Sequence, residues 1–262
     1  WQANEDALAF FRNQAQAAEW DFLPQNNYIY ATSGNERLEN EMAAYEKLQI
    51  PACWETNLPL PFPISGALCF TNQAQFHPLK FAANISAALR IYENTKAISL
   101  SNNQVRTPKG TITAEKVIIA TRFPMLNKHG AYFLKLYQQR SYVIALENAG
   151  KVDGMYLDCA ENGLSVRSAG KWLLLGGGGH RTGKQGLGWQ LPEAVAHKYY
   201  PRAQIAARWA TQDCMTLDGL PYIGRYSNAT PNLYVATGFQ KWGMSTSMVA
   251  AMILTDLIQD KE

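Results

Sequence analysis

A glycine-rich stretch, LLLGGGGHRTGKQGLGW, occupies residues 173–189. Read from Gly178 it has the spacing Gly-x-x-x-x-Gly-Lys, which ends at Lys184 and lies one residue short of a phosphate-binding loop. Such a loop also needs a Ser or Thr for magnesium at the start of a helix, but Gln185 stands there. The following GLGWQLP does not begin a stable helix. The pattern therefore favours a strand end whose glycines let another chain segment or a flat ligand approach closely.

A second stretch, LYVATGFQKWGMSTSMVAAMILTDLI, covers residues 233–258. It predicts a buried strand, a loop with the spacing Gly238-x-x-x-x-Gly243, and an apolar helix. Ser245 and Ser247 fall in the first turn of that helix, where hydroxyl groups satisfy free backbone donors. The backbone N–H groups of the loop and of the first helical turn, together with the positive end of the helix dipole, can bind an anion or an electron-rich carbonyl edge. The same pattern also fits a tight turn that only packs a core helix.

The remaining chain supplies elements that would position these stretches. Apolar spacing predicts helices over residues 2–22, 36–48 and 77–90. A β-meander then reads as IYEN, AISL, QVRT, TIT and finally VIIAT at 117–121. A second β-rich region spans roughly 139–213 and contains one short helix. Because the strands at 117–121 and 233–237 are both short and apolar without alternation, we expect them to pair in one sheet.

Composition narrows the function classes. The chain has 262 residues, of which 47% are apolar, and a net charge of +3 without any block of like charge. This balance argues against a nucleic-acid partner, and no apolar run is long enough for a transmembrane segment. The four cysteines lie apart, with no Cys-x-x-Cys or Cys-x-His pair, so we expect no metal site and a cytoplasmic location.

The segments DGLPYIGRY and PNLYVATGFQKWGMSTSMVAAMILTDLI resemble the C-terminal flavin-contacting part of a known family. This is the family of FAD-dependent oxidoreductases that includes D-amino acid oxidase and glycine oxidase. The form TGFQKWGM is most similar to members that often carry a C-terminal Rieske domain. Other stretches resemble the family in the same order, namely QAQFHPLKFAANISAAL, IYENTKAI, VRTPKGTITAEKVIIATRFP, RSYVIAL, MYLD and LLLGGGGHRTG.

The resemblance implies an α+β fold in which a β-rich substrate domain is interleaved with the C-terminal part of a glutathione-reductase-like FAD-binding domain. The substrate domain would comprise residues 1–71 and 129–213, and the FAD domain residues 72–128 and 214–262. The resemblance places the flavin contacts at Thr121, Gly238, Phe239, Gln240, Lys241, Trp242, Gly243, Met244 and Ser245. His180, Arg181 and Arg140 would be the candidates near the substrate, with a cationic side chain for a substrate carboxylate.

The implied chemistry is oxidation of a C–N bond in an amine or amino acid. Hydride would pass from carbon to flavin N5, and the imine product would hydrolyse. The alternative is a non-catalytic fragment or subunit that needs another chain for cofactor binding. A nucleotide-binding protein of the phosphate-loop type is the remote alternative.

Three departures from the family pattern bear on these expectations. No segment matches the strand, GxGxxG loop and acidic residue that hold the ADP half of FAD. Arg122 follows Thr121 where the family usually has Gly or His, and the Rieske ligand pairs are absent. We therefore expect this chain alone to bind FAD weakly or not at all. We also expect self-association, or a partner chain, at an unpaired sheet edge near 117–121.

Overall fold

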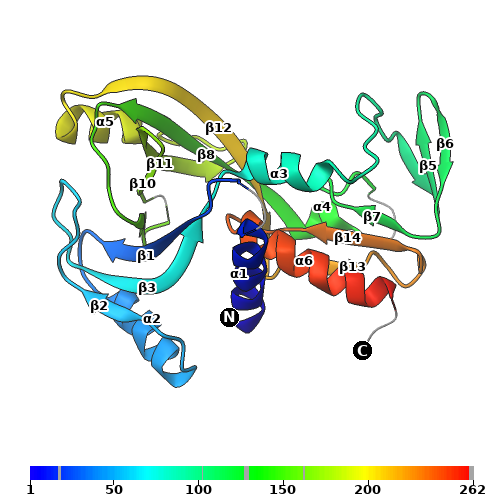
Figure 1. Cartoon of the computed structure of the whole chain (residues 1–262), viewed down its shortest axis with the longest axis horizontal. Helices are drawn as coiled ribbons and strands as arrows, with labels where there is room; N and C mark the ends of the chain where they lie inside the picture. The colour runs from blue at the N-terminus through cyan, green and yellow to red at the C-terminus, as the bar shows by residue number, and fades with distance from the viewer. Residues whose placement is uncertain (17–18, 102, 127–129, 162, 260–262) are drawn as a thin grey trace. The chain divides into compact units, whose positions relative to one another are not determined.

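The chain divides into two compact units in a computed structural model that describes residues 1–16, 19–101, 103–126, 130–161 and 163–259. Unit 1 comprises Trp1–Ala18, Leu79–Gln138 and Asp213–Glu262, and unit 2 comprises Glu19–Pro78 and Gln139–Gln212. Most elements of both units are labelled in Figure 1.

Unit 2 is built on a large mixed sheet with the strand order β12-β8-β11-β10-β9-β1-β3-β2. Strand β1 pairs antiparallel with β3 and parallel with β9. Two helices, α2 and α5, complete the unit. The elements are β1 (Leu23–Ala31), α2 (Glu36–Lys47), β2 (Cys53–Glu55), β3 (Gly66–Gln75), β8 (Leu136–Glu147), β9 (Met155–Asp158), β10 (Ser165–Ala169), β11 (Trp172–Arg181), α5 (Gln190–Tyr199) and β12 (Gln204–Thr216).

The two faces of this sheet are covered differently. Alternate residues of neighbouring strands, among them Ile144, Val166 and Leu175, form the main core, in which Ala196 of α5 also lies. Helix α2 instead contacts β1 and β3 and places Leu38 in a second core. Because side chains alternate along a strand, Arg167 must lie on the face opposite to Val166.

Unit 1 contains the remaining helices and strands. Its three-stranded sheet has the order β13-β14-β7, and a separate meander has the order β4-β5-β6. Helix α6 contacts β13, β14 and helix α1. The elements are α1 (Gln2–Ala15), α3 (Pro78–Ser86), β4 (Ser99–Ser101), β5 (Gln104–Thr107), β6 (Gly110–Thr113), β7 (Val117–Ile119), α4 (Tyr132–Lys135), β13 (Tyr222–Arg225), β14 (Leu233–Thr237) and α6 (Gly243–Ile258).

The expected pairing of two apolar strands is confirmed. Strand β14 runs parallel to β7, with Leu233 opposite Val117 and Val235 opposite Ile119. All five residues of β14 are buried, as expected for a strand covered on both faces. Strand β7 is the last strand of its sheet, so one of its edges forms no ladder with the described residues.

Several expected elements differ from the structure. The segment IYEN at 91–94 is not a strand, because Asn94 adopts a left-handed conformation with φ of 51° and the meander begins only at Ser99. The first helix ends at Ala15 rather than at residue 22, and Asp21 has φ of 57°, which no helix residue can have.

The observed units also differ from the expected domain boundaries at the N-terminus. Residues 1–71 were expected to form one part of the substrate domain. In the structure helix α1 contacts α6 and lies in unit 1, whereas β1, α2, β2 and β3 lie in unit 2. The helical pattern of α1 showed that it has a buried stripe, including Phe11, but not which partner buries it. None of the described helices is long and apolar enough to cross a membrane.

Candidate functional site

The loop between β14 and α6 contains two glycines with different roles. Gly238 has φ of 73°, and a Cβ atom on it would lie 2.3 Å from Cγ2 of Thr216, so the position excludes a side chain. A Cβ atom on Gly243 would meet nothing within 4 Å. Gly238 is therefore needed for the turn itself, whereas Gly243 leaves open space at the start of the helix.

The N-terminus of α6 offers free backbone donors. Trp242 is the N-cap residue and makes no side-chain capping bond. The N–H groups of Gly243, Met244 and Ser245 are the first of the helix and have no intrahelical acceptor. Together with the helix dipole they form a positive end that suits a carbonyl edge or an anion. These are the groups that a flavin ring would need at its pyrimidine end.

The carboxyl end of β7 is fastened to the end of β14 beside this loop. The hydroxyl of Thr237 donates a hydrogen bond to the carbonyl of Arg122. Thr121 in turn donates through Oγ1 to the carbonyl of Phe123 over 2.8 Å. Arg122 has φ of 63°, which is the left-handed region that favours glycine. The departure from the family pattern thus falls on a residue with a strained backbone, in a turn that the surrounding bonds hold.

Not all of the predicted flavin-contact side chains are free for a ligand. Phe239 packs against the core that α6 forms with β14. The side-chain amide of Gln240 donates to Oγ1 of Thr216 over 3.4 Å, and Lys241 pairs with Asp213 over 3.3 Å. Trp242 is exposed. The backbone of the loop therefore carries the ligand-binding potential, and several of its side chains anchor it.

The glycine run of β11 lets a neighbouring segment approach closely. A Cβ atom on Gly178 would lie 2.0 Å from the carbonyl oxygen of Gly188, whose N–H donates to the carbonyl of Gly178 over 3.2 Å. A Cβ atom on Gly186 would lie 2.4 Å from Cδ2 of His180. The loop of residues 182–189 thus folds back on the strand, and its glycines accommodate chain rather than phosphate.

His180 forms a defined pair with Tyr142. Its Nδ1 lies 3.0 Å from the carbonyl oxygen of Arg181, which can only accept, so Nδ1 carries the proton of the neutral ring. Nε2 must then accept the hydrogen bond of 2.9 Å from the Tyr142 hydroxyl. Arg140 lies over the Tyr142 ring at 6.0 Å, and Trp189 meets the ring edge-on at 4.8 Å. The structure therefore brings the predicted candidates Arg140 and His180 together around one tyrosine.

Arg167 is a candidate that sequence reasoning missed. It lies in the middle of β10, on the sheet face opposite to Val166, and it is half-buried. Burial lowers the pKa of its guanidinium, which nevertheless stays protonated in proteins. In the described part of the chain its only hydrogen-bond partner is the neutral Oε1 of Gln75, at 3.5 Å. A cation in the centre of a short strand was the signal that could have identified it.

The described residues contain no group of three or more His, Cys, Asp or Glu side chains that could hold a metal ion. All four cysteines are free thiols. Burial is the main cause that raises the pKa of the Cys69 and Cys159 thiols. Neither thiol therefore has the lowered pKa of a reactive cysteine.

Comparison with known proteins shows the family and the fold of the chain. A family model described as FAD dependent oxidoreductase (DAO) matches residues 1–257. The chain therefore belongs to this family, and the resemblance seen in the sequence is confirmed. The structure is also similar to a glycine oxidase from Geobacillus kaustophilus, with a TM-score of 0.79 and 21% identity over 100% of this chain and 78% of that one. It is likewise similar to an L-proline dehydrogenase from P. horikoshii, with a TM-score of 0.81 and 14% identity over 99% of this chain and 79% of that one.

The sequence is also related to a curated protein of Bacillus subtilis (strain 168), YhfW, whose name describes it as a Rieske 2Fe-2S iron-sulfur protein. The two are 31% identical over 283 residues, which cover 100% of this chain and 56% of the relative. The chain thus spans about half the length of this relative. The α+β fold expected from the sequence is confirmed by these structural similarities.

Proposed function

We propose that the protein takes part in flavin-dependent oxidation of a C–N bond in an amino acid. Bound FAD would be the two-electron acceptor, to which the hydride of the C–H bond next to nitrogen is transferred. The backbone of Gly238 to Ser245 and the turn at Thr121 would hold the flavin ring, because they combine free donors with open space at Gly243. Unit 1 would then be the cofactor unit and unit 2 the substrate unit.

The observation that carries this proposal is the guanidinium of Arg167. A half-buried cation with only a neutral partner has not recovered its hydration energy, so it gains from an anionic ligand. Its planar group matches a carboxylate with two parallel hydrogen bonds. The names of the two structural neighbours, glycine oxidase and L-proline dehydrogenase, point to amino-acid substrates as well.

Arg167 replaces Arg140 and Arg181 as our first candidate for the substrate carboxylate. Arg140 and Arg181 are both exposed, and Arg140 lies against the Tyr142 ring. The Tyr142–His180 pair lies on the other face of the sheet from Arg167, so we do not place it at this contact. Neither group is needed to take a proton from carbon in such a reaction, because the hydride leaves with its electron pair.

A non-catalytic role for the isolated chain is the second candidate. It is favoured by the lack of a GxGxxG unit in the sequence and by the longer length of the curated relative. In that case another part of the whole protein, or another chain, would bind the ADP half of FAD. The relative's name makes an iron–sulfur domain a candidate electron acceptor, and we propose a cytoplasmic location for the whole protein.

The substrate proposal is tested by replacing Arg167 with Met in the full-length protein. A lost charge-assisted pair should weaken binding of carboxylate substrates by about 10- to 100-fold. Turnover of a panel of amino acids is compared with turnover of their decarboxylated amines, with flavin bleaching as the readout. The R167K variant should recover part of the binding, and R202M, at an exposed arginine of the same unit, should change nothing.

If R167M weakens binding of amines and amino acids equally, Arg167 does not hold the carboxylate. If no amino acid or amine bleaches the flavin of the wild-type protein, the proposed reaction is refuted.

A further inference from the structure

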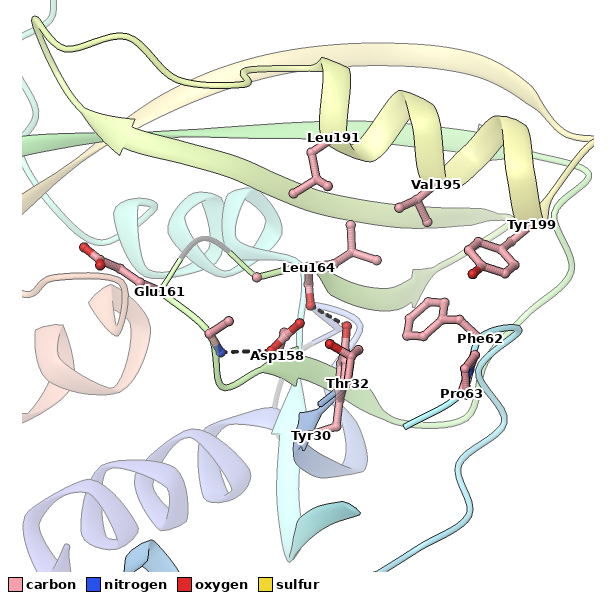
Figure 2. A pocket seen from close by; sticks show the side chains of 12 residues that line it. Tyr30, Thr32, Phe62, Pro63, Asp158, Glu161, Leu164, Leu191, Val195 and Tyr199 are labelled. Carbon is pink, nitrogen blue, oxygen red and sulfur yellow. Dashed lines mark hydrogen bonds between the residues drawn. The ribbon is translucent and has the colours of Figure 1, made fainter. Parts of the chain in front are cut away.

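A cavity of about 630 Å³ lies in unit 2, beside helix α5. It is lined from four parts of the unit: the end of β1, the loop at Phe62, the loop that follows β9, and α5. Figure 2 shows these side chains around the opening. The volume falls in the range of small-molecule sites. Arg167 lies on the opposite face of the sheet, so the cavity is separate from the proposed substrate contact.

The lining carries negative charge without any cation. It includes Asp158 and Glu161, whereas none of the described lining residues is Lys, Arg or His. Oδ1 of Asp158 accepts the N–H of Ala160 over 2.9 Å, which fixes the carboxylate. Figure 2 shows the carboxylate of Asp158 turned toward Thr32, while Glu161 points away from them at the rim. Oδ2 of Asp158 therefore remains as an acceptor with a fixed position.

The rest of the lining is apolar and aromatic. The rings of Phe62 and Tyr199 meet edge-on, with their centroids 5.5 Å apart, and form one wall. Leu191 and Val195 of α5 continue this wall. Aromatic faces carry partial negative charge and attract ammonium groups. The ammonium of Lys198, which lies 4.7 Å from the Tyr199 ring centre at the surface, shows the same attraction.

The floor of the cavity is already formed. Tyr30 is fully buried beneath it and donates its hydroxyl hydrogen to the carbonyl of Leu164 over 2.9 Å. Burial, and secondly the charge of Asp158, raise the pKa of Tyr30, so the hydroxyl stays neutral. The hydrogen bonds at the floor of the cavity are therefore already made, and ligand binding would not have to order the side chain of Tyr30.

We propose that this cavity binds an organic cation: a primary ammonium group at Asp158 and Thr32, with its apolar body against Phe62, Tyr199, Leu191 and Val195. The ammonium group would donate hydrogen bonds to the carboxylate of Asp158 and to the hydroxyl oxygen of Thr32. An anionic ligand at this position would meet the carboxylate of Asp158, with a second negative charge, that of Glu161, at the rim, so it binds less well than a cation. A zwitterionic amino acid would bring its own carboxylate toward them, so it binds more weakly than the corresponding amine.

The test uses the full chain and 2-phenylethylamine as the probe, with L-phenylalanine and phenylacetate as matched ligands. Ligand-observed NMR and calorimetry should show binding in the order amine, amino acid, acid. The D158N variant keeps an oxygen for the Ala160 N–H and should weaken amine binding by about tenfold or more. The control is E147Q, at an exposed carboxylate that pairs with Lys171 over 2.5 Å, and it should bind the amine as wild type does.

A second variant keeps the test decisive if D158N is poorly folded. F62L keeps an apolar side chain, although a smaller one, but removes the ring, and should weaken amine binding by about two- to fivefold. R167M should leave amine binding unchanged, which separates this cavity from the proposed substrate contact. Equal binding of amine and phenylacetate, or wild-type affinity in both D158N and F62L, would overturn the proposal.

Discussion

Gly178 offers the sharpest test of how unit 2 is built, because its replacement by Ala has two separable costs. Gly178 has φ of 66°, a conformation that costs a residue with a side chain about 1–2 kcal/mol. The new Cβ atom would also stand 2.0 Å from the carbonyl oxygen of Gly188, and this oxygen must retreat by about 1 Å to reach 3.0 Å. That movement breaks the hydrogen bond from the Gly188 N–H, which contributes about 1 kcal/mol.

The matched control is Gly183→Ala in the same loop. Gly183 has φ of 86°, but a Cβ atom there would meet nothing within 4 Å, so only the conformational cost applies. We expect G178A to lower the free energy of unfolding by about 2–3 kcal/mol and G183A by about 1–2 kcal/mol. At about 3 °C per kcal/mol, the melting temperature falls by about 6–9 °C and about 3–6 °C respectively.

The assay is thermal and urea unfolding of both variants, together with hydrogen exchange of the Gly188 amide. Exchange at Gly188 should speed up in G178A and stay unchanged in G183A, because only the first variant breaks that bond. If G178A is no less stable than G183A and protects Gly188 equally, the loop does not rest on β11 as described, and the account of the glycine run is refuted.

Three further predictions concern unit 1. In the full-length protein, Gly243→Leu should abolish flavin retention but leave the circular dichroism spectrum largely intact, since the side chain would fill open space rather than clash with the fold. Unchanged flavin content would remove this loop from the cofactor site. The backbone N–H of Leu220, and then the Tyr222 hydroxyl, hold the pKa of Asp218 below its ordinary value. A lowered folded-state pKa stabilises the fold at neutral pH, and this contribution is lost as the pH falls through that pKa. D218N should therefore destabilise unit 1 in urea unfolding at neutral pH, with a difference that shrinks as the pH falls from about 4 toward about 2, and a constant difference would contradict this. Finally, residues 1–262 alone should bind FAD weakly in fluorescence quenching and should scatter light as more than a monomer, because one edge of β7 forms no ladder with the described residues and Ile118 on this strand is 45% exposed. Tight stoichiometric FAD binding by a monomer would refute both expectations.

Local signals in the sequence were strong where an element is buried on several sides. The strand at 233–237 and the helix at 243–258 have the expected bounds, since an unbroken apolar run and flanking glycines leave few alternatives. IYEN failed for the opposite reason. It contains β-forming residues, but its backbone pairs with none of the described strands, and Asn94 adopts a left-handed conformation there.

The loop that we propose for the cofactor, at Gly238–Ser245, can be located in the sequence by its spacing, but the contacts of its side chains come from distant parts of the chain. Phe239 belongs to a core, and Lys241 is engaged by Asp213, which lies 28 residues earlier. Thr121 was expected near the loop from the resemblance alone. Its turn is in fact fastened to Thr237 by a hydrogen bond that spans more than a hundred residues. Sequence spacing cannot reveal partners at that separation, although it locates the loop that they hold.

Whether a side chain can reach the substrate depends on the face of the sheet on which it lies. For His180, this face is determined by one glycine. Tyr142 pairs with Gly177 and lies on the face of the main core, so regular alternation would place His180 on the opposite face, with Arg167. The register slips by one residue between Gly177 and His180, where Gly178 adopts its left-handed conformation. This is a β-bulge, which moves His180 to the face of Tyr142 and makes their hydrogen bond possible. Alternation in LSVRSA needs no such correction, and it leaves Arg167 opposite the core as the candidate for an anionic substrate. The glycine run therefore has a structural role, because the bulge at Gly178 places His180 beside Tyr142.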